Sequence, residues 1–391
     1  MDGPRACRPE EFDEVIELIN QTFRIGSDQN IRTDYPLVFD RDRLEYMRII
    51  RTEGKVVAHV PVAPRQVVAG DDTFTVGIIS PTITHPDYRR RGYATLCLRD
   101  CVRIMEERDW PVAALWTQEA TFPFYHHSGW EAVGVQGWAY RLDAEDRHLF
   151  ARGSFEVAVC GPENSDHLDG IIRIHDAEPF RIARTPIEYQ ALFSLPKITT
   201  FVALEKGEVQ AYLMAGSGTN KPGLIEGGGN AAALESLVAH VLAGMERGQI
   251  QVILPSTPTQ LGGLVQARKP TSRAPVEGAA GVGPQMMRVN SLDLLRRIEG
   301  YLTERSVGLH GRVSLVCSDT EESITLEFAD GRVGFSTEPG VAPVVLSRRQ
   351  LAQLIFGGHA ALSPLVLPEE QGELLAQVFP YYFPIWELDH S

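Results

Sequence analysis

The stretch from residue 77 to residue 107 joins an apolar strand to an amphipathic helix through a turn that contains three consecutive arginines. The run GIISPTIT at 77–84 predicts a buried strand, and apolar side chains recur at the helical repeat from Gly92 to Glu107. Arg89–Arg91 stand directly before Gly92, between the two elements. Any fold adopted by this chain must therefore contain a strand–turn–helix junction at this point.

The arginines are unusual because the chain as a whole is acidic, with 37 lysines and arginines, 51 aspartates and glutamates, and a formal net charge of −14. The first N–H groups of a helix have no partner within the helix, and the helix dipole is positive at that end. Glycine also lets the backbone approach a ligand closely. These features predict an anion-binding site at Arg89–Gly92. The alternative is a solvated helix cap that binds nothing.

Composition excludes several classes of protein. No apolar run reaches the length of about 18 residues that a membrane span needs, and residues 1–15 lack the apolar segment of a signal peptide. No Cys or His spacing typical of a metal site occurs, so we expect no metal. The scattered cysteines indicate a reduced, cytoplasmic protein, and Cys97 and Cys101 are interpreted as apolar packing on one helix. The acidic balance favours cationic partners, and we expect no nucleic acid or membrane partner.

The order of predicted elements divides the chain into three domains, at 1–150, 151–284 and 285–391. The first opens with an amphipathic helix at 10–23, in which Phe12, Val15, Ile16, Ile19 and Phe23 share a face. An antiparallel meander follows. It has three apolar runs, and its turns are predicted at Glu53-Gly54 and at Gly70-Asp71-Asp72. After the helix at 92–107, further strands are predicted, at 111–118, 130–134 and 138–142.

The second domain partly repeats the order of the first. We predict helices at 171–179 and 186–195, a hairpin that turns at Lys206-Gly207, a helix at 231–248 and a strand at 250–255. This order indicates an internal structural repeat. A Pro/Gly-rich stretch at 269–284 leads into the third domain, a small α+β domain that begins with a strand and a helix at 286–302. The fold class predicted for the whole chain is α+β.

The arginine turn is neither a P-loop nor a dinucleotide fingerprint, because GxxxxGK[ST] and GxGxxG are both absent. Arg89-x-x-Gly92-x-Ala94 resembles the R/Q-x-x-G-x-G/A signature of the GNAT acetyltransferases, whose backbone amides hold the pyrophosphate of acetyl-CoA. The resemblance implies that the preceding strand offers backbone groups to the pantetheine arm. The coenzyme-binding residues implied in this way are Thr82, Ile83, Thr84, Arg89, Arg90, Arg91, Gly92, Tyr93, Ala94 and Thr95.

The layout of the whole chain resembles the Eis (enhanced intracellular survival) family of N-acetyltransferases. That resemblance implies tandem GNAT folds, with mainly antiparallel sheets and flanking helices, followed by a sterol-carrier-like (SCP2-like) domain at 285–391. It also implies acetyl-CoA as the co-substrate and a homo-oligomer, a hexamer built from trimers. The third domain could instead bind a lipid, although apolar residues such as Leu351 and Ile355 are interpreted as a closed core.

Tyr125 is the candidate general acid. It lies in FYHHSGW at 124–130, a segment that resembles the GNAT stretch whose tyrosine lies near the coenzyme sulfur. A phenol can protonate a departing thiolate, but Tyr125 can equally be a core aromatic. In Eis-type enzymes the base is the terminal carboxylate, here that of Ser391. Relatives often end on an aromatic residue, whereas this chain ends on serine. His126 and His127 are alternative bases.

The second domain lacks the coenzyme signature, because Glu226 to Asn230 contains glycines but no arginine ahead of the predicted helix. We therefore expect no coenzyme there, and expect this domain to shape the acceptor cleft. Asp28, Asp34 and Tyr35 could line that cleft, or they could simply face solvent.

The sequence thus predicts an acetyl-CoA-dependent N-acetyltransferase. Its expected acceptor is a primary amine of a cationic, aminoglycoside-like small molecule or of a lysine side chain. The rival hypothesis is a catalytically inactive, lipid- or coenzyme-binding regulatory protein. The Arg89–Thr95 turn together with Tyr125 favours an enzyme. A purely structural interaction protein would leave the arginine turn unexplained.

Overall fold

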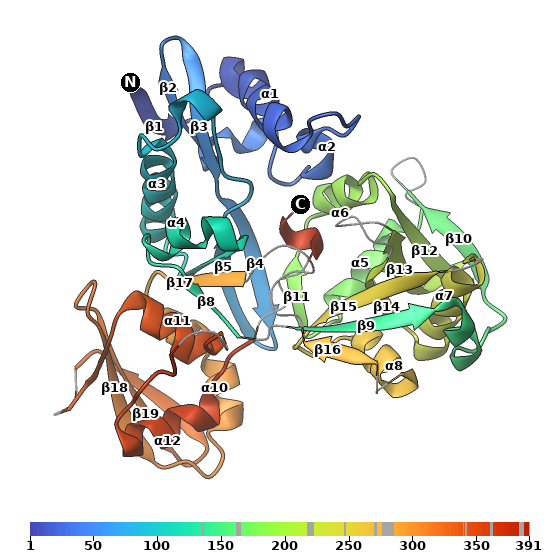
Figure 1. Ribbon diagram of the computed structural model, residues 1–391. Coiled ribbons are helices and arrows are strands. Elements are labelled where there is room, and N and C mark those ends of the chain that lie inside the picture. Colours follow the sequence, from blue (N-terminus) through green and yellow to red (C-terminus); the bar gives the residue numbers. More distant parts are fainter. Residues whose placement is uncertain are drawn as a thin grey trace. The chain divides into compact units, whose positions relative to one another are not determined.

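The computed structural model describes residues 1–134, 137–161, 166–216, 223–245, 248–269, 272–275, 285–338, 340, 342–359, 363–382 and 387–390. The chain forms two compact units, both visible in Figure 1. Unit 1 consists of Met1–Asp28, Asp40–Val135 and Glu277–Tyr382. Unit 2 consists of Gln29–Phe39, Gln136–Val276 and Phe383–Ser391. Each unit therefore draws on stretches that are far apart in the sequence.

An antiparallel four-stranded sheet carries the N-terminal part of unit 1. The turn between its two central strands falls at Glu53 and Gly54, where the sequence predicts it, and these residues have φ of 52° and 77°. In spatial order the strands are β1 (Asp2–Ala6), β2 (Met47–Thr52), β3 (Lys55–Pro61) and β6 (Ile83–Thr84).

Helix α1 (Phe12–Phe23) packs against β3, and four of its five predicted apolar contacts are buried. Phe23 is the exception, because it is 45% exposed at the C-terminal end of the helix. The prediction that Phe23 belongs to the buried face is therefore wrong, because the last residue of the helix stays largely open to solvent.

The second sheet of unit 1 joins the N-terminal region to a strand from much later in the chain. In order, its strands in unit 1 are β4 (Ala63–Ala69), β5 (Asp72–Ile78), β7 (Val112–Trp116), β17 (Gln285–Val289) and β8 (Glu131–Ala132). Strands β5 and β7 are parallel because helix α3 (Tyr93–Glu107) crosses between them, whereas β17 is antiparallel to both β7 and β8. The strand predicted to open the third domain thus completes the sheet of the first (Figure 1).

The stretch between the two predicted turns forms two strands instead of one. Strand β3 ends at Pro61 and β4 begins at Ala63, and the two strands belong to different sheets. Pro61 and Pro64 have no N–H to donate to a ladder, which limits continuous pairing across this point. The N–H of Val62 instead donates to the carbonyl of Tyr46 at 3.0 Å. The predicted three-run meander is therefore four strands, split between two sheets.

Helix α3 (Tyr93–Glu107) covers the N-terminal sheet by packing on β2 and β3. Its buried face includes Cys97, Leu98, Cys101 and Met105, as the helical repeat predicts. Both cysteines are free thiols, and burial raises the pKa of Cys97 to about 12. This confirms their interpretation as packing residues, because a thiol with such a pKa stays protonated and unreactive.

The remainder of unit 1 is a small α+β arrangement between residues 294 and 378. Its sheet has the order β20-β19-β18-β21 and is antiparallel except for the β18–β21 pair. The strands are β18 (Gly311–Cys317), β19 (Ser323–Ala329), β20 (Arg332–Ser336) and β21 (Val344–Leu346). The helices are α9 (Leu294–Arg297), α10 (Glu299–Arg305), α11 (Arg348–Phe356) and α12 (Glu369–Val378). Leu351, Leu354, Ile355 and Phe356 are buried, as a closed core requires.

Unit 2 is built on one seven-stranded sheet of order β10-β12-β13-β14-β15-β9-β16. The predicted hairpin is confirmed, with Lys206 and Gly207 at positive φ between β12 and β13. Strand β14 pairs in parallel with β15, and β9 is antiparallel to β15. The strands are β9 (Gly137–Asp143), β10 (Glu156–Cys160), β12 (Ile198–Glu205), β13 (Glu208–Gly216), β14 (Gly223–Gly229), β15 (Gln249–Pro255) and β16 (Arg273–Pro275).

Helices of unit 2 pack on this sheet to form two apolar clusters. Helix α7 ends at Ala243 rather than at the predicted residue 248, and Gly244 forms its C-cap. The elements are α2 (Ile31–Asp34), α5 (Leu168–Asp176), β11 (Phe180–Ala183), α6 (Pro186–Phe193), α7 (Ala231–Ala243), α8 (Gln260–Arg268) and the 3-10 helix η6 (Glu387–His390).

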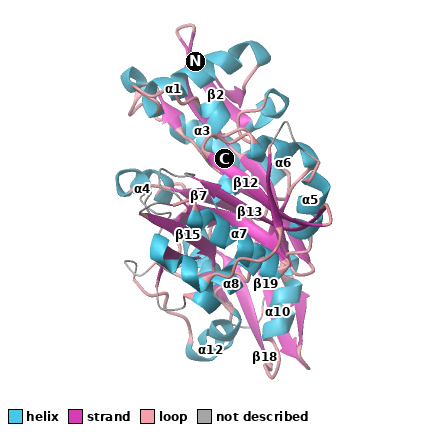
Figure 2. Ribbon diagram, turned by 90° about the vertical axis from the view of Figure 1, so that its right-hand side faces the viewer, coloured by secondary structure: helices cyan, strands magenta, loops and turns pink. Residues whose placement is uncertain are grey.

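The two units share a local pattern. In unit 1 the hairpin β4–β5 is followed by α3 and by β7, which is parallel to β5, and the distant strand β17 is antiparallel to β7. In unit 2 the hairpin β13–β14 is followed by α7 and by β15, which is parallel to β14, and the distant strand β9 is antiparallel to β15. Figure 2 shows the mixture of helices and strands that results. The predicted α+β class with GNAT-like sheets and flanking helices is confirmed.

Candidate active site and coenzyme loop

The arginine turn places an uncapped helix N-terminus at the surface. Gly92 is the N-cap of α3 and has a left-handed conformation, with φ 79° and ψ 2°. No side chain caps the helix, and no acidic residue lies in its first turn. The carbonyl of Gly92 accepts from the N–H of Leu96 at 3.0 Å, which begins the bonding of the helix.

The backbone amides of this turn are unsatisfied. None of the N–H groups from Arg90 to Thr95 has a hydrogen-bond acceptor within the part of the chain that the structure describes. Arg90 and Gly92 both have positive φ, 61° and 79°. Such a run of free N–H groups at the positive end of a helix binds anions.

The three arginines add positive charge to this turn. All three are exposed. Arg89 donates from Nε to the carbonyl of Thr84 at 3.3 Å, and Arg91 donates from Nη2 to the carbonyl of Asp87 at 3.1 Å. Arg91 also lies over the ring of Tyr88, 4.9 Å from its centroid. Backbone and ring contacts therefore hold two of the guanidinium groups beside the loop, while Arg90 has no partner among the described residues.

The predicted pantetheine strand is shorter than expected. Strand β6 contains Ile83 and Thr84 and pairs antiparallel with β3, while Thr82 lies just outside it. Thr82 Oγ1 is buried and has no well-formed hydrogen bond within the described structure. It nevertheless lies close enough to the phenol of Tyr125 to affect the pKa of that group. The structure thus brings Thr82 and Tyr125 together.

Tyr125 lies in the short helix α4 (Phe122–His126) and is 8% exposed. Burial raises the pKa of its phenol, and the Thr82 hydroxyl partly opposes this shift. The ring is edge-on to Phe124 and Trp130, with centroids 4.8 and 6.4 Å away. A protonated phenol in an apolar surrounding suits a general acid, and the same packing suits a core aromatic, so the catalytic role of Tyr125 stays a prediction.

The two histidines after Tyr125 have different surroundings. His126 stacks on Phe122, with centroids 5.1 Å apart, and its Nε2 lies 3.3 Å from Glu131 Oε2 and 2.8 Å from Arg349 Nη1. His127 is exposed and its Nδ1 lies 2.5 Å from the carbonyl of Pro123. The His126 ring thus contacts both a carboxylate and a guanidinium.

The corresponding helix in unit 2 has a different N-terminus. Asn230 caps α7, and its side chain accepts from the N–H groups of Ala232 and Ala233 at 3.0 and 3.2 Å. Glu226 is not in a turn as the sequence suggested, because β14 continues to Gly229. At least two N–H groups in the first turn of α7 are thus bonded to a side chain, whereas no side chain caps α3.

The remaining predicted site residues are Asp28, in unit 1, and Asp34, Tyr35 and Ser391, in unit 2. Asp28 is exposed at the end of the first stretch of unit 1, and Asp34 and Tyr35 lie at the end of α2 in unit 2. Tyr35 packs edge-on against Phe39, with ring centroids 6.5 Å apart. Ser391 lies outside the described residues, so its role stays a prediction.

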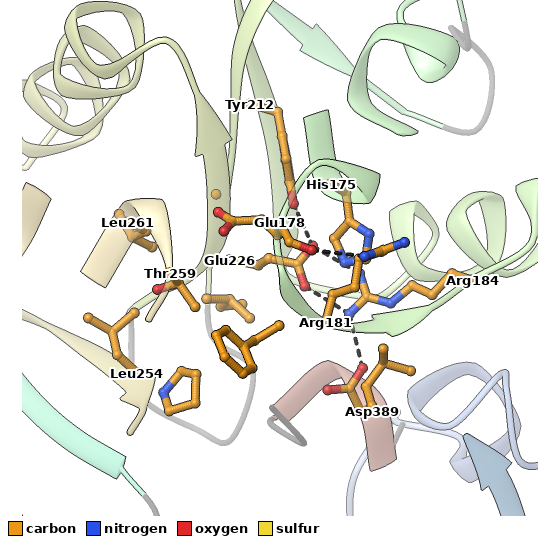
Figure 3. Close-up of a pocket in the computed structure, with 15 residues that line it drawn as sticks. His175, Glu178, Arg181, Arg184, Tyr212, Glu226, Leu254, Thr259, Leu261 and Asp389 are labelled. Carbon is orange, nitrogen blue, oxygen red and sulfur yellow. Dashed lines mark hydrogen bonds and ion pairs between the residues drawn. The ribbon is translucent and has the colours of Figure 1, made fainter. Parts of the chain in front are cut away.

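Sequence reasoning missed a cluster of buried charges in unit 2. Arg184 forms ion pairs with Glu226 and Asp389, which are 42 and 205 residues away in the sequence. These residues line one pocket together with side chains of α5, β11, β14 and α8 (Figure 3). Nothing local in the sequence could reveal this cluster, because no two of its members share an element.

Comparison with known proteins identifies the N-terminal part of the chain. Residues 4–133 match the family model of the acetyltransferase (GNAT) domain. Residues 4–133 are a GNAT acetyltransferase domain. This GNAT domain contains the arginine turn and Tyr125, and the prediction of an acetyltransferase is confirmed at this level. Enzymes of this class use acetyl-CoA.

Solved GNAT structures resemble the whole chain. A GCN5-related N-acetyltransferase from Kribbella flavida is 17% identical, with a TM-score of 0.67 over 97% of both chains. One from Anabaena variabilis ATCC 29413 is 15% identical, with a TM-score of 0.64 over 90% of this chain and 89% of the other. Eis1 from Mycobacterium abscessus is 14% identical, with a TM-score of 0.62 over 99% of both. At these identities the similarity shows the fold. No curated protein sequence matches this chain significantly.

No helix among the described residues is long and apolar enough to cross a membrane. Within the same residues, no group of three or more His, Cys, Asp and Glu side chains is arranged to hold a metal ion.

Proposed function

We propose that this chain is an acetyl-CoA-dependent N-acetyltransferase whose acceptor is a primary amine of a cationic small molecule or of a lysine side chain. The observation that carries the proposal is the free run of N–H groups from Arg90 to Thr95 beside three exposed arginines. A pyrophosphate satisfies both features at once, because it has several acceptor oxygens and at least two negative charges. Thr82, Ile83 and Thr84 would then face the pantetheine arm.

In the proposed reaction the amine nitrogen attacks the thioester carbonyl carbon, and the C–S bond breaks. The sulfur takes the proton of Tyr125, which leaves a phenolate. The nitrogen loses a proton to the base. That proton then returns to the phenolate through solvent. A phenol and a departing thiolate have similar basicity, so Tyr125 is able to supply this proton. We assign the base to the terminal carboxylate of Ser391, with His126 or His127 as the alternative.

The substrate class is supported by charge. The formal net charge of −14 raises the local concentration of cationic acceptors such as aminoglycoside-like amines. We further propose three domains at 1–150, 151–284 and 285–391, of which the last is sterol-carrier-like and structural. A cytoplasmic location and a homo-oligomer, a hexamer by resemblance, complete the proposal.

The deciding experiment measures thiol release from acetyl-CoA with a panel of cationic amines, with mass spectrometry of the acetylated product. The rival function, an inactive lipid- or coenzyme-binding regulator, predicts a thermal shift with a fatty acid or with acetyl-CoA but no product.

For the base, we expect chain extension beyond Ser391 to lower kcat at least about tenfold without changing acetyl-CoA affinity, because each added residue moves the carboxylate by about 3.3–3.6 Å. Full activity of the extended enzyme would show that a group other than the terminal carboxylate acts as the base.

A further inference from the structure

The pocket of unit 2 lies where two parallel strands separate. Strands β14 and β15 pair only between Gly223–Leu224 and Gln251–Val252. Beyond this point both strands contribute to the wall of the pocket, with Ile225, Glu226 and Gly227 from β14 and Leu254 and Pro255 from β15 (Figure 3). The pocket has a volume of about 70 Å³, which is room for several water molecules or for one end of an organic molecule.

The equivalent place in unit 1 is the proposed coenzyme site. There the parallel strands β5 and β7 pair as far as Ile78 and Ala114, and the chain then leaves this sheet to form β6. Thr82 and Tyr125 lie near each other just beyond this separation. The repeated strand order thus gives the pocket of unit 2 the position at which the pantetheine arm is proposed in unit 1.

The pocket of unit 2 is nevertheless not arranged for the coenzyme. Asn230 caps the helix that follows β14, so the first N–H groups of α7 are already bonded. The N–H of Gly229 donates to Gln260 Oε1, and the N–H of Gln260 donates to Glu178 Oε1 at 3.0 Å. Helix α8 therefore lies against the free edge of β14, and a smaller ligand is needed to fill the remaining space.

The carboxylates that line the pocket are unequally paired. Glu226 and Asp389 share the guanidinium of Arg184, at 2.8 and 3.0 Å from Nη2. Glu178, by contrast, has no cationic side chain within ion-pair distance in the described parts of the chain, although it is only 7% exposed. Within the same parts, its Oε2 accepts no hydrogen bond. One nearly buried carboxylate at the pocket therefore lacks a counter-ion.

The environment of Glu178 favours a cation. Burial raises the pKa of its carboxyl, and the N–H of Gln260 opposes this shift while the charge of Glu226 adds to it. A buried carboxylate without a partner is costly, and a cation that enters removes part of that cost.

The rest of the lining restricts the ligand further. Three carboxylates and two guanidinium groups line the pocket, which leaves one negative charge, and both guanidinium groups already have carboxylate partners. An anion would therefore find no free cation. Phe180, Ile182, Leu254 and Leu261 supply an apolar wall that suits a hydrocarbon group.

We propose that this pocket is a second ligand site, which binds a small organic monocation through an ammonium group paired with Glu178 and a hydrocarbon part on the apolar wall. The site goes beyond the proposed acetyl transfer, since it lies within unit 2 and needs no coenzyme. Its occupant joins β14, β15 and the segment between α5 and β11, and so should stabilise unit 2.

The first experiment compares n-butylamine, n-butanol and butyrate as probes, by ligand-observed NMR titration of the full chain at pH 7 without acetyl-CoA. The three probes are similar in size and differ in charge. We expect the ammonium ion to bind at least about tenfold more tightly than the alcohol, because a charge-assisted bond replaces a neutral one, and butyrate to bind least. Equal binding of amine and alcohol, or no binding of the amine, overturns the proposal.

The second experiment locates the site with Glu178→Gln. This variant keeps an oxygen for the N–H of Gln260 and removes the charge, so n-butylamine should bind at least about tenfold more weakly. Without ligand, its melting temperature should equal or exceed the native value, since a neutral amide is less costly to bury than an unpaired carboxylate. Glu205→Gln, at an exposed carboxylate on β12, is the matched control and should change neither property.

A purely structural role for Glu178 predicts the reverse result, namely a lower melting temperature and native affinity for the amine. Native affinity in Glu178→Gln therefore overturns the proposal. Because acetyl-CoA is absent from these measurements, their outcome is the same whether or not the chain acetylates an amine, and failure of the proposed function would leave this test intact.

Discussion

Arg48 on β2 and Asp100 on α3 form a buried ion pair, with Nε 2.5 Å from Oδ2 and each side chain 9% exposed. This pair fixes the helix that presents the arginine turn against its sheet. Asp100→Asn should lower the free energy of unfolding by about 3 kcal/mol, since it leaves a buried guanidinium without its counter-charge. Chemical denaturation followed by circular dichroism measures this loss.

The matched control for that prediction lies on the same helix. Glu107 pairs with Arg103 at 2.6 Å, but its side chain is 58% exposed. Glu107→Gln should change stability by less than about 0.5 kcal/mol. Equal stability of the Asp100→Asn and native proteins would show that the pair contributes nothing.

The arginine turn should determine coenzyme affinity. Replacing Arg90 and Arg91 together with alanine should weaken acetyl-CoA binding about tenfold to a hundredfold, because two charges near the pyrophosphate are lost. Isothermal titration measures the dissociation constant, and the effect should shrink at high salt. Arg99→Ala removes an exposed charge from the same helix and is the control. An unchanged dissociation constant in the double variant would show that the arginines are only a solvated helix cap.

Gly92 should be needed for its conformation. A Cβ added there meets no atom within 4 Å, so Gly92→Ala creates no clash in the free protein. The φ of 79° is nevertheless unfavourable for alanine, and we expect a stability loss of about 1–2 kcal/mol. The loss in acetyl-CoA affinity should be larger than this, because any change of φ at Gly92 also moves the N–H groups of the turn. Calorimetry and titration together separate the two effects, and a loss of stability without a loss of affinity would remove Gly92 from the coenzyme loop.

Tyr125→Phe should lower kcat about 10²–10⁴-fold with little change in KM for acetyl-CoA, because the ring packing is kept and only the proton is lost. Since burial raises the pKa of Tyr125 above its ordinary value of 10, the phenol stays protonated below that pH. The loss of rate from its ionisation should therefore begin only above about pH 10 in the pH profile of the native enzyme. Native activity of the variant would leave Tyr125 as a packing residue.

Acid should destabilise unit 2 through His175. Burial lowers the pKa of this ring to about 4, and its Nδ1 forms a hydrogen bond of 2.6 Å with the hydroxyl of Tyr189. Because the folded pKa lies below the unfolded value of 6.5, the unfolded state binds more protons between these values. Stability should thus be complete above about pH 6.5 and fall as the pH drops towards 4. Thermal melts of native and His175→Gln proteins across this range should show a flatter dependence in the variant, and parallel curves would contradict the assignment.

Most local elements were predictable from the sequence, because apolar periodicity and turn chemistry act over a few residues. The helix at α3, the β12–β13 hairpin and the arginine turn all lie where the pattern predicts them. The motif Arg89-x-x-Gly92-x-Ala94 also pointed to the GNAT domain that the family model identifies at 4–133. Errors occurred at the ends of elements and at breaks between them. Phe23, at the end of α1, is exposed, and β3 and β4 are separate strands in different sheets. Packing against other elements and strand pairing decide such positions, and neither is visible in the local sequence.

The pairing of distant segments was not predictable from the sequence and becomes visible in the folded chain. Strand β17 was predictable as a strand, but its place between β7 and β8 was not, since an apolar strand shows which face is buried and not which neighbour it pairs with. The same holds for β9, which the sequence assigned to the first domain and which pairs with β15 in unit 2. Arg184, Glu226 and Asp389 form one ion-pair cluster across up to 205 residues. A charge carries no local signal of its partner, because the Coulomb attraction that joins them depends on distance in space and not on separation along the chain.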